Sequence, residues 1–502
     1  MKIKNITAAL LFIVITAAAL LTACASDGAA NNPDLQKPVD ADPADIANEN
    51  SESPIEEDMF AGIEKGTYNG REFTILAREP MFEEFYSEEE TGDVINDSIY
   101  KRNVTVEDTF GVKINVIINP GDWTESTIKK AVMAGDGAYE LVDNYAAWVG
   151  SLVTSGLYLN LLDIPHLRLT EPWWSQHAVD ELTVNGKLFV VPGDISLNLW
   201  KTIMTVFFSK GLRQNFDLEN PYELVKSGQW TFDKMIEMSK GMSADLNGDG
   251  LMYTEDRYGT FIYDDLTFVN FHNAFNIPTT LKDANGIPHS TLDSPEVFEL
   301  AERMYNLAVS TEGVIYGNQA DGFNKLYTSG YPIVQTSLDM FMNDQILFYP
   351  TTLGVAEDLR IMETDFGILP YPKKDALQSE YKTASRDQHT MFGIPIDVKD
   401  VDFAGHIAEA LCVASNKIVI PAYYDIALIN KFTRDDESAE MLDIIRQGLN
   451  FDFGIVFAAQ TNQAGWMIRT SVNQKSFSFA STIEKSAVKN ESALEKFLAA
   501  FE

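Results

Sequence analysis

Strand and helix patterns alternate along the chain after residue 70, and this alternation constrains the fold more than any other sequence feature. The stretch Arg71–Ala77 has the length and the β-branched content of a strand. Apolar residues over Ile95–Phe110 recur at helical spacing, and Gly111 is well placed to end that helix. Further strand patterns cover Val112–Ile118 and Glu140–Val142. This order predicts an open α/β sheet.

The first 24 residues have the pattern of a secretory leader. Lys2 and Lys4 give it a positive start, and Ile6–Leu20 is an uncharged apolar run. Leu21–Cys24 then supplies small residues in front of a cysteine. The run is too short to cross a membrane comfortably, and small residues at its end are typical of a cleavage site. We therefore expect residues 1–23 to be removed as a signal peptide.

The end of this leader resembles the lipobox of bacterial lipoproteins. The resemblance implies that Cys24 becomes the first residue after cleavage and carries acyl chains. Several acyl chains give stable anchoring to a membrane, whereas a single chain holds only marginally. An ordinary signal peptide followed by an incidental cysteine is the alternative. We expect an extracytoplasmic protein that lipid anchors to the cell membrane.

An acidic segment with several prolines follows Cys24. Residues 25–60 contain ten Asp or Glu, one Lys and four Pro. Such a segment cannot bury enough apolar surface to fold, and its charges repel one another. We expect residues 24–65 to form a disordered stalk that holds the folded part away from the membrane.

The charge balance of the whole chain restricts its partners. The 502 residues include 74 Asp plus Glu and 38 Lys plus Arg, a formal net charge of −36. A surface this negative repels phosphate backbones, so we expect no nucleic-acid partner. Hydrophobic residues make up 45% of the chain, which is enough for a large core. Cys412 lies in an apolar stretch and is expected to be a small buried hydrophobe.

Three segments carry a further resemblance when they are taken together and in order. They are Gly135–Val142 (GDGAYELV), Asn185–Pro192 (NGKLFVVP) and Trp230–Gly259, which contains an Asp-rich loop. With the lipobox and the stalk, they resemble extracellular solute-binding proteins of the family-one type, the carbohydrate-binding lipoproteins of ABC importers. The resemblance covers about residues 68–502.

The resemblance implies a two-lobed α/β fold of the periplasmic-binding-protein-like kind (type II), with the ligand in a cleft between the lobes. Three segments are expected to cross between the lobes, near Val191–Asp194, near His389–Gly393 and near Asp435. Closure of two lobes around a ligand is a hinge motion at such crossings. The expected boundaries are residues 66–192 plus 390–434 for lobe one and 193–389 plus 435–502 for lobe two.

An acidic loop in the third segment matches a calcium-binding pattern with one change. Asp245, Asn247 and Asp249 occupy its first, third and fifth positions, and Leu251 would add a carbonyl oxygen at the seventh. Calcium takes about six to eight oxygen ligands, and a loop of this spacing supplies them as it wraps. The twelfth position is Asp256, which is shorter than the Glu of an EF-hand. We expect a structural calcium ion here; a solvated acidic loop with Asx turns is the alternative.

Aromatic and planar polar residues are the candidates for ligand contacts. Flat rings match the apolar faces of a pyranose, and planar Asp, Asn and Arg groups match its rim of hydroxyls. The resemblance places such contacts after the first and third strands, after a strand at Ile333–Thr336, beside the crossings and near the C-terminus. The residues at these places are Arg78, Glu79, Asn144, Tyr145, Trp148, Asp194, Trp200, Asp339, Phe341, Arg386 and Trp466. Core packing is the alternative for every aromatic among them. For Trp173 and Trp174, pinning the surface of lobe one is an equal alternative to sugar contact.

The sequence contains few motifs that are typical of enzymes. The chain has no Gly-x-Gly-x-x-Gly, no phosphate-binding loop, no Gly-x-Ser-x-Gly and no His-Glu-x-x-His. Ser-x-x-Lys occurs, for example at Ser98, Ser126 and Ser379, without the partner motifs of penicillin-binding proteins, and the six histidines show no metal spacing. With 74 acidic residues, some pair of carboxylates at glycosidase spacing is guaranteed, so such a pair is no evidence. We expect binding, not catalysis.

The sequence therefore predicts the substrate-binding lipoprotein of an ABC importer, monomeric and specific for a mono- or oligosaccharide. Its partners would be the carbohydrate and the transmembrane subunits of the permease. Two other interpretations stay open. A secreted polysaccharide-degrading lipoprotein would turn over polymer, and a receptor or adhesin on the same fold would bind ligand without depending on a permease.

Overall fold

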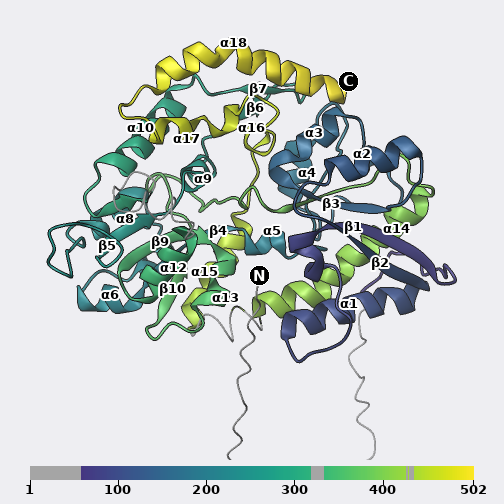
Figure 1. Ribbon diagram of the computed structural model, residues 1–502, viewed down its shortest axis with the longest axis horizontal. Helices are drawn as coiled ribbons and strands as arrows, with labels where there is room; N and C mark the ends of the chain where they lie inside the picture. The colour runs from purple at the N-terminus through teal and green to yellow at the C-terminus, as the bar shows by residue number, and fades with distance from the viewer. Residues whose placement is uncertain (1–57, 318–332, 426–427, 429–434) are drawn as a thin grey trace, which may run out of the picture. The chain divides into compact units, whose positions relative to one another are not determined.

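The computed structural model describes residues 58–317, 333–425, 428 and 435–502. The signal peptide expected over residues 1–23, the lipidated Cys24 and the stalk up to residue 57 lie outside the described residues. The remainder forms one unit that contains two large sheets, each with its own helices (Figure 1).

The first sheet is built by the strands that the sequence predicts near the start of the folded part. Its strands are β1 (Arg71–Arg78), β2 (Val112–Asn119), β3 (Leu141–Tyr145) and β11 (Thr390–Gly393), in the order β11-β3-β1-β2. β1 pairs in parallel with β2 and β3, and β11 pairs antiparallel with β3. The carboxyl ends of the three parallel strands therefore meet at one edge, where β11 begins. The α/β class and the three N-terminal strands are confirmed.

The helices around the first sheet are α1 (Val94–Phe110), α2 (Glu125–Ala134), α3 (Val149–Thr154), α4 (Gln176–Leu182) and α14 (Val401–Ala414) (Figure 1). The carboxylate of Asp93 accepts hydrogen bonds from the backbone N–H groups of Ile95 and Asn96, which caps α1. Gly111 ends α1 with a φ of 63°, as the sequence predicts. A Cβ at this position would lie 2.7 Å from Oγ1 of Thr67, so glycine is needed for space as well as for conformation.

The second sheet has the order β10-β4-β9-β5-β8 and is largely buried. Its strands are β4 (Met204–Ser209), β5 (Tyr258–Ile262), β8 (Val314–Tyr316), β9 (Ile346–Thr352) and β10 (Phe366–Leu369). β5 pairs in parallel with β8 and β9, whereas β4 is antiparallel to β9 and β10. A separate hairpin is formed by β6 (Thr280–Lys282) and β7 (Pro288–Ser290).

The helices of the second half of the chain mostly surround this second sheet (Figure 1). They are α5 (Asn198–Lys201), α6 (Lys210–Asn215), α7 (Pro221–Lys226), α8 (Phe232–Ser239), α9 (Leu266–Ala274), α10 (Pro295–Val309), α12 (Ile333–Met342), α13 (Ala356–Leu359), α15 (Asp436–Gln447), α16 (Phe453–Val456), α17 (Met467–Val472) and α18 (Phe479–Leu498). The hydroxyl of Thr231 accepts from the backbone N–H of Lys234 at 3.3 Å, so the cap expected for α8 is confirmed.

The strand expected at Ile333–Thr336 is wrong, because this segment is the first turn of α12. A short run of β-branched and apolar residues does not distinguish a strand from a buried helix by its pattern alone. The residues that follow decide the matter: Ser337, Leu338 and Phe341 are buried at helical spacing. The predicted contacts Asp339 and Phe341 therefore lie within a helix and not in a loop after a strand.

The first crossing segment (residues 192–203) and the second crossing segment (residues 384–391) connect the two sheets. Val191 forms an antiparallel bridge with Phe392 next to the first sheet. Ile203 forms an antiparallel bridge with Ser385 next to the second sheet. The two segments are thus paired near both of their ends, which is the arrangement of a hinge. We call the first sheet with its helices lobe one, and the second sheet with its helices lobe two.

The third expected crossing, near Asp435, is only partly visible. The carboxylate of Asp435 accepts from the backbone N–H of Ser438 at 2.6 Å and caps α15, which packs on β10 of lobe two. Residues 429–434, which precede it, lie outside the described residues. The third crossing and the lobe boundaries given above stay predictions.

A buried carboxylate anchors two tryptophans of lobe one. The indole N–H groups of Trp173 and Trp174 donate to Glu409 at 2.9 and 2.8 Å. Arg168 donates to the same carboxylate at 2.8 Å. Cys412 is buried, and its Sγ donates to the backbone carbonyl of Trp173 at 3.1 Å. Both tryptophans fix the interior of lobe one, and the expected burial of Cys412 is confirmed.

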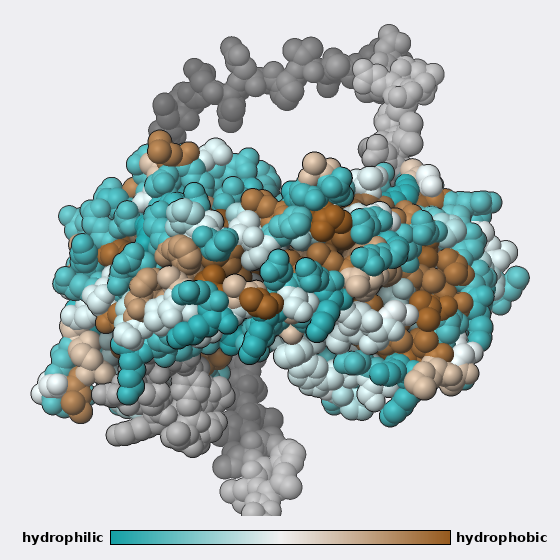
Figure 2. Space-filling view, turned by 90° about the horizontal axis from the view of Figure 1, so that it is seen from above, coloured by the Kyte–Doolittle hydropathy of each residue, from teal (hydrophilic) through white to brown (hydrophobic). Residues whose placement is uncertain are grey.

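The C-terminal helix α18 contacts both lobes. Near its start, the ring of Phe479 lies 5.8 Å from that of Phe298 in α10. Just after its end, the ring of Phe501 lies 5.2 Å from that of Phe189, which precedes the first crossing segment. Seen from above, the surface is mainly hydrophilic and the hydrophobic residues form separate patches (Figure 2). The helical stretch Val401–Asp425 is long and apolar enough to cross a membrane, but 83% of its most apolar window is buried inside the protein.

Candidate ligand-binding site

Polar and aromatic side chains gather where the parallel strands of each lobe end. In lobe one, β1, β2 and β3 end at Arg78, Asn119 and Tyr145. In lobe two, β5 ends directly before Tyr263 and Asp264. Ligands of open α/β sheets bind beyond the carboxyl ends of strands. These ends therefore define the candidate site.

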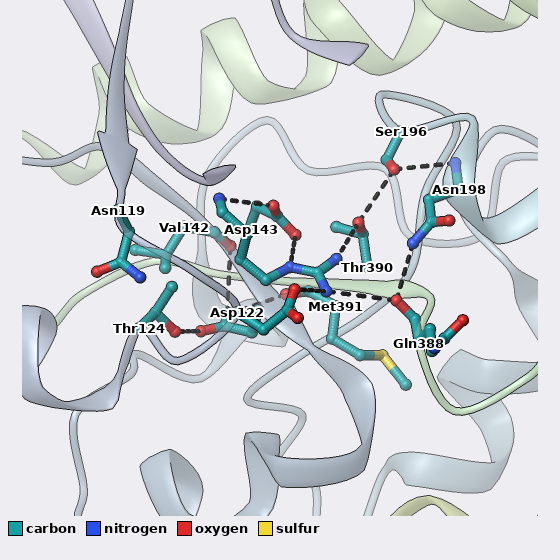
Figure 3. Close-up of polar contacts among 12 residues, drawn as sticks. Asn119, Asp122, Thr124, Val142, Asp143, Ser196, Asn198, Gln388, Thr390 and Met391 are labelled. Atoms are coloured by element: carbon teal, nitrogen blue, oxygen red, sulfur yellow. Dashed lines mark hydrogen bonds and ion pairs between the residues drawn. The ribbon is translucent and has the colours of Figure 1, made fainter. Parts of the chain in front are cut away.

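Arg78 is almost completely buried and uses its whole guanidinium group; Figure 3 shows the polar contacts around it. Its Nε and its backbone N–H donate to the two carboxylate oxygens of Asp143, both at 3.0 Å. Its Nη2 donates to Oγ1 of Thr390 at 3.0 Å, and its Nη1 donates to the carbonyl of Gln388 at 3.4 Å. Burial raises the pKa of Asp143, and the charge of Arg78 offsets part of this rise. One side chain at the end of β1 thus holds the second crossing segment.

The first crossing segment is tied to the same two acceptors (Figure 3). The hydroxyl oxygens of Ser196 and Thr390 lie 3.0 Å apart, and Nδ2 of Asn198 donates to the carbonyl of Gln388 at 2.8 Å. Glu84 of lobe one accepts from the hydroxyl of Ser196 and, at 2.9 Å, from the backbone N–H of Asn198. Burial raises the pKa of Glu84. Both crossing segments and lobe one therefore meet in one polar network.

Trp123, Tyr145 and Trp148 form an aromatic platform beside this network. The ring of Trp123 stacks on that of Tyr145 at 6.1 Å, with 20° between the planes, and lies 5.1 Å from the ring of Trp148. Trp123 is 59% exposed and Trp148 is 41% exposed, which is unusual for such large apolar side chains. The carboxylate of Asp122, next to Trp123, lies 3.6 Å from the guanidinium of Arg78. Exposed ring faces beside a carboxylate are the surface that a pyranose requires.

A set of ion pairs lies near Tyr145 of the platform. Arg386 in the second crossing segment donates to the carboxylate of Asp264 and to the hydroxyl of Tyr263, and its Nε lies 3.8 Å from Asp387. Burial alone would lower the pKa of Arg386, but the neighbouring acids, Asp264 first, raise it overall. Burial raises the pKa of Asp387. Burial also raises the pKa of Tyr145 to about 12, and the negative charge of Asp387 adds to this rise. The charges of the second crossing segment therefore act on a ring of the platform.

A second ion pair and a tryptophan adjoin this set. Nε of Arg469 donates to Asp265 at 2.9 Å, and Asn473 donates to the same carboxylate at 2.9 Å. The guanidinium of Arg469 lies 5.6 Å from the ring centre of Trp466. Trp466 is buried, and its indole N–H has no hydrogen-bond partner among the described residues. Because a buried N–H without a partner costs free energy, Trp466 is suited to donate to a bound ligand.

Two of the predicted contacts, Asn144 and Glu79, form hydrogen bonds that hold neighbouring parts of lobe one in place. Oδ1 of Asn144 accepts from Tyr158 at 2.6 Å and from Thr124 at 3.0 Å, and its Nδ2 donates to the carbonyl of Met391 at 2.9 Å. Glu79 is exposed and accepts from the backbone N–H of Gly121 at 3.1 Å, which holds the loop that carries Trp123. Direct ligand contact by either residue stays a prediction.

Asp194 and Trp200 line a different pocket, of about 480 Å³, together with Trp174, His177 and Arg446. The indole N–H of Trp200 donates to Asp194 at 2.9 Å, and Asn416 donates to the other oxygen at 2.7 Å. Burial raises the pKa of Asp194 to about 6. The structure thus separates these two residues from the aromatic platform.

Asp339 and Phe341 are also set apart from the platform. Phe341 is buried, and its ring lies 5.5 Å from that of Tyr349 and 6.4 Å from that of Phe207. Asp339 accepts from Gln335 at 2.8 Å on the same helix. Phe341 packs in the core of lobe two, and ligand contact by both residues stays a prediction.

Four site residues are not predicted from the sequence: Trp123, Asp264, Asp265 and Arg469. Trp123 lies in the loop after β2, and the two acids follow β5. The rule that ligands bind beyond strand ends, applied to the predicted strand Val112–Ile118, points to Trp123, whereas no strand is predicted at β5. Arg469 is three residues after Trp466, and residues at this spacing are neighbours on the surface of a helix, so Arg469 could have been predicted from Trp466.

The acidic loop at Asp245–Asp256 closes through its own backbone. The carboxylate of Asp245 accepts from the N–H groups of Gly248 at 2.6 Å and Gly250 at 2.8 Å, which lowers its pKa. Asp256 is buried and accepts from Leu246 at 2.9 Å and from Tyr253 at 2.6 Å. Among the described residues, no three acidic, histidine or cysteine side chains are gathered as metal ligands are. Each carboxylate oxygen that accepts one N–H keeps a second lone pair, so the donor set remains compatible with a cation.

No protein-family model matches the chain, and no curated protein matches it. Its fold is similar to those of solved ABC substrate-binding proteins. A cyclo/maltodextrin-binding protein complexed with maltotetraose has a TM-score of 0.52 and 14% identity, and the match covers 86% of this chain and 97% of that chain.

Two further structures show the same similarity. An ABC transporter solute-binding protein from Agrobacterium radiobacter K84 in complex with ribitol has a TM-score of 0.51 and 12% identity, over 84% of this chain and 99% of that chain. An ABC substrate-binding protein from Listeria monocytogenes in complex with cycloalternan has a TM-score of 0.50 and 12% identity, over 86% of this chain and 98% of that chain. The two-lobed α/β fold that the sequence resemblance implies is confirmed.

Proposed function

We propose that this protein is the extracytoplasmic substrate-binding component of an ABC importer and that it binds a carbohydrate between its lobes. The aromatic platform carries the proposal. Two exposed tryptophan rings lie beside Asp122 on lobe one, and the charges of Asp387 and Arg386 in the second crossing segment act on Tyr145 of the same platform. The fold similarity supports it, since the similar structures hold maltotetraose, ribitol and cycloalternan.

The proposed mechanism is closure of the two lobes around an unchanged ligand. A ligand that touches both lobes binds the closed form more tightly than the open form and so shifts the population toward it. The paired crossing segments supply the hinge. We propose no bond-breaking step, so the carbohydrate is to be recovered intact after incubation with the protein.

A thermal-shift screen tests the carbohydrate class. The panel contains D-glucose, D-galactose, D-mannose, D-xylose, ribitol, maltose and maltotetraose. Binding at a concentration of 100 times Kd stabilises the folded state by about 2.7 kcal/mol, which raises Tm by several degrees. Chromatography of the sugar after incubation tests for turnover. Absence of a shift with every sugar would reject the carbohydrate proposal, and cleavage of maltotetraose would reject the proposal of binding alone.

The permease partner and the monomeric state belong to the same proposal. The closed protein would present surfaces of both lobes to the transmembrane subunits. Deleting the permease is expected to abolish uptake of the bound sugar while leaving its binding intact. Size-exclusion chromatography with light scattering is expected to give the mass of a single chain. Uptake that persists without the permease would instead favour a receptor with no transport role.

We also propose that the chain is a lipoprotein of the cell surface, cleaved before Cys24 and anchored through it. The lipobox and the acidic stalk support this proposal. Cys24→Ala is expected to release the protein from the membrane fraction. Mass spectrometry of the N-terminus is expected to find acyl chains on the wild-type protein, and an unmodified Cys24 would reject the anchor.

A structural calcium ion in the loop Asp245–Asp256 remains a proposal as well. The spacing of the acids and the second lone pairs of their oxygens support it. A chelator is expected to lower Tm, and Asp249→Asn is expected to remove this effect. Asp283→Asn is the matched control, because Asp283 also accepts backbone N–H groups in a tight turn. A Tm that changes neither with chelator nor with added calcium would reject the proposed calcium site.

A further inference from the structure

A cavity of about 40 Å³ lies where the two lobes and the second crossing segment meet. Ala146 and Ala147, which separate Tyr145 from Trp148 in the aromatic platform, form part of its wall. Lobe two contributes residues of α9 and of the segment 450–456. A space of this size holds one water molecule or one hydroxyl group, since about 10–15 Å³ suffices for a water.

Three polar atoms of residues that line this cavity accept no hydrogen bond in the described part of the chain. They are Oδ1 of Asp387, Nε2 of His389 and Oδ1 of Asn450. His389 is 2% exposed and Asn450 is 8% exposed. Oδ1 of Asp387 lies 3.8 Å from Nε of Arg386, which is an ion-pair distance and not a hydrogen bond. Buried polar atoms without a partner are rare, and each of these requires an explanation.

All three atoms are hydrogen-bond acceptors. Nδ1 of His389 lies 2.7 Å from the carbonyl of Arg386, and because a carbonyl only accepts, Nδ1 carries the proton. Burial lowers the pKa of His389 to about 4, so the ring is neutral near pH 7 and Nε2 offers a lone pair. The cavity therefore suits a neutral donor of hydrogen bonds and repels an anion.

We propose that this cavity receives one hydroxyl group of the bound carbohydrate, which donates its proton to Oδ1 of Asn450 or to Nε2 of His389. This inference rests on the proposed function. The cavity adjoins the platform, because the two alanines in its wall are the residues between Tyr145 and Trp148. A hydroxyl held there contacts the second crossing segment and lobe two at once, so it stabilises the closed arrangement. Sugars that place a carboxylate at this position are excluded by the same acceptors.

Asn450→Leu tests the proposal, because it removes one acceptor at nearly constant volume. Each panel sugar that shifts the Tm of the wild-type protein is titrated by calorimetry into both proteins. Loss of one hydrogen-bond partner is expected to weaken binding about tenfold or more, while Tm of the ligand-free protein stays unchanged. Asn285→Leu, in an exposed turn, is the control and is expected to leave affinity unchanged.

Ala147→Val is the second variant, since it fills the cavity and leaves the acceptors in place. It is expected to weaken binding of the same sugar at least tenfold without lowering Tm. Affinities within twofold of the wild type in both variants would overturn the proposal and leave the carbohydrate function standing. A lower Tm of Asn450→Leu with unchanged affinity would also overturn it, since it identifies a resident water. Failure of the wild-type protein to bind any panel sugar would reject the proposed function and this inference together.

Discussion

Arg78 donates to Oγ1 of Thr390 at 3.0 Å, and the hydroxyl oxygen of Ser196 lies 3.0 Å from the same atom (Figure 3). Arg78 ends the first strand of lobe one, Ser196 belongs to the first crossing segment, and Thr390 begins β11 at the end of the second crossing segment. A single hydroxyl oxygen therefore joins one lobe to both segments of the hinge. The carbonyl of Gln388 has the same double role, since Arg78 and Asn198 both donate to it.

Thr390→Val removes this shared oxygen without changing the shape of the side chain. The guanidinium of Arg78 loses an acceptor in a buried place, which costs about 1–3 kcal/mol and more for a charged group, and the hydroxyl of Ser196 loses a polar neighbour. We expect a fall of about 2–4 kcal/mol in the free energy of unfolding, measured with urea. Thr390→Ser keeps the oxygen and is expected to lose less than about 1.5 kcal/mol. Equal losses in the two variants would contradict a role for the oxygen.

The ion pair of Arg78 with Asp143 is expected to matter far more than a surface pair of the same chemistry. The side chains of Arg78 and Asp143 are 1% and 0% exposed. Asp143→Ala leaves the guanidinium buried without its partner, and we expect a loss of about 3–5 kcal/mol. The pair of Lys101 with Glu90, at 3.2 Å, is the control because both side chains are at least half exposed. Glu90→Ala is expected to cost less than about 1 kcal/mol in the same urea experiment.

Trp123 is expected to contribute to ligand affinity and not to stability. Its ring is more than half exposed and stacks on Tyr145 at the edge of the candidate site. For the panel sugar that binds, Trp123→Ala is expected to raise Kd at least tenfold, since ring stacking and apolar contact are lost. Phe216→Ala, an exposed aromatic of α6's end, is the control for losing an exposed ring. Unchanged Kd in calorimetry for Trp123→Ala would remove the aromatic platform from the binding site.

How far the sequence predicts this structure differs between the two lobes. The strands of lobe one are apolar, β-branched and separated by a helix with a clear cap and a terminal glycine, so their patterns are unambiguous. The segment Ile333–Thr336 has the composition of a strand, yet it begins α12, because the burial of Leu338 and Phe341 is decided by tertiary packing. Local pattern alone does not carry that information.

The candidate site shows the same division. Arg78 and Tyr145 follow predicted strands, so the strand-end rule places both. Trp123 follows the predicted strand Val112–Ile118, so the same rule reaches it, whereas Asp264 follows β5, a short strand that contains a glycine and is not predicted. The pairing of Arg386 with Asp264 joins residues that are 122 positions apart, and only the folded chain brings them together. Sequence reasoning therefore finds the residues next to strong local patterns and misses those whose position depends on topology.

The titration of Asp194 gives the last prediction, because the pKa of this buried carboxyl is raised to about 6 from an ordinary value of 3.8, chiefly by burial. The folded protein then holds a proton that the unfolded chain releases between about pH 4 and pH 6, so stability falls as pH rises through this window and levels off above it. A shift of about two pKa units corresponds to about 3 kcal/mol.

Asp194→Asn mimics the protonated state at every pH, and the amide of Asn416 turns over to face the new side chain. Urea denaturation between pH 4 and pH 7 is the measurement. The free energy of unfolding of the wild-type protein is expected to fall by about 2–3 kcal/mol relative to Asp194→Asn across this range. Asp217→Asn, at an exposed position, is the control for the loss of a carboxyl group. If the free energies of unfolding of the wild type and of Asp194→Asn changed in parallel with pH, Asp194 would titrate normally. The hydrogen bonds from the indole N–H of Trp200 and the amide of Asn416 would then fully offset its burial.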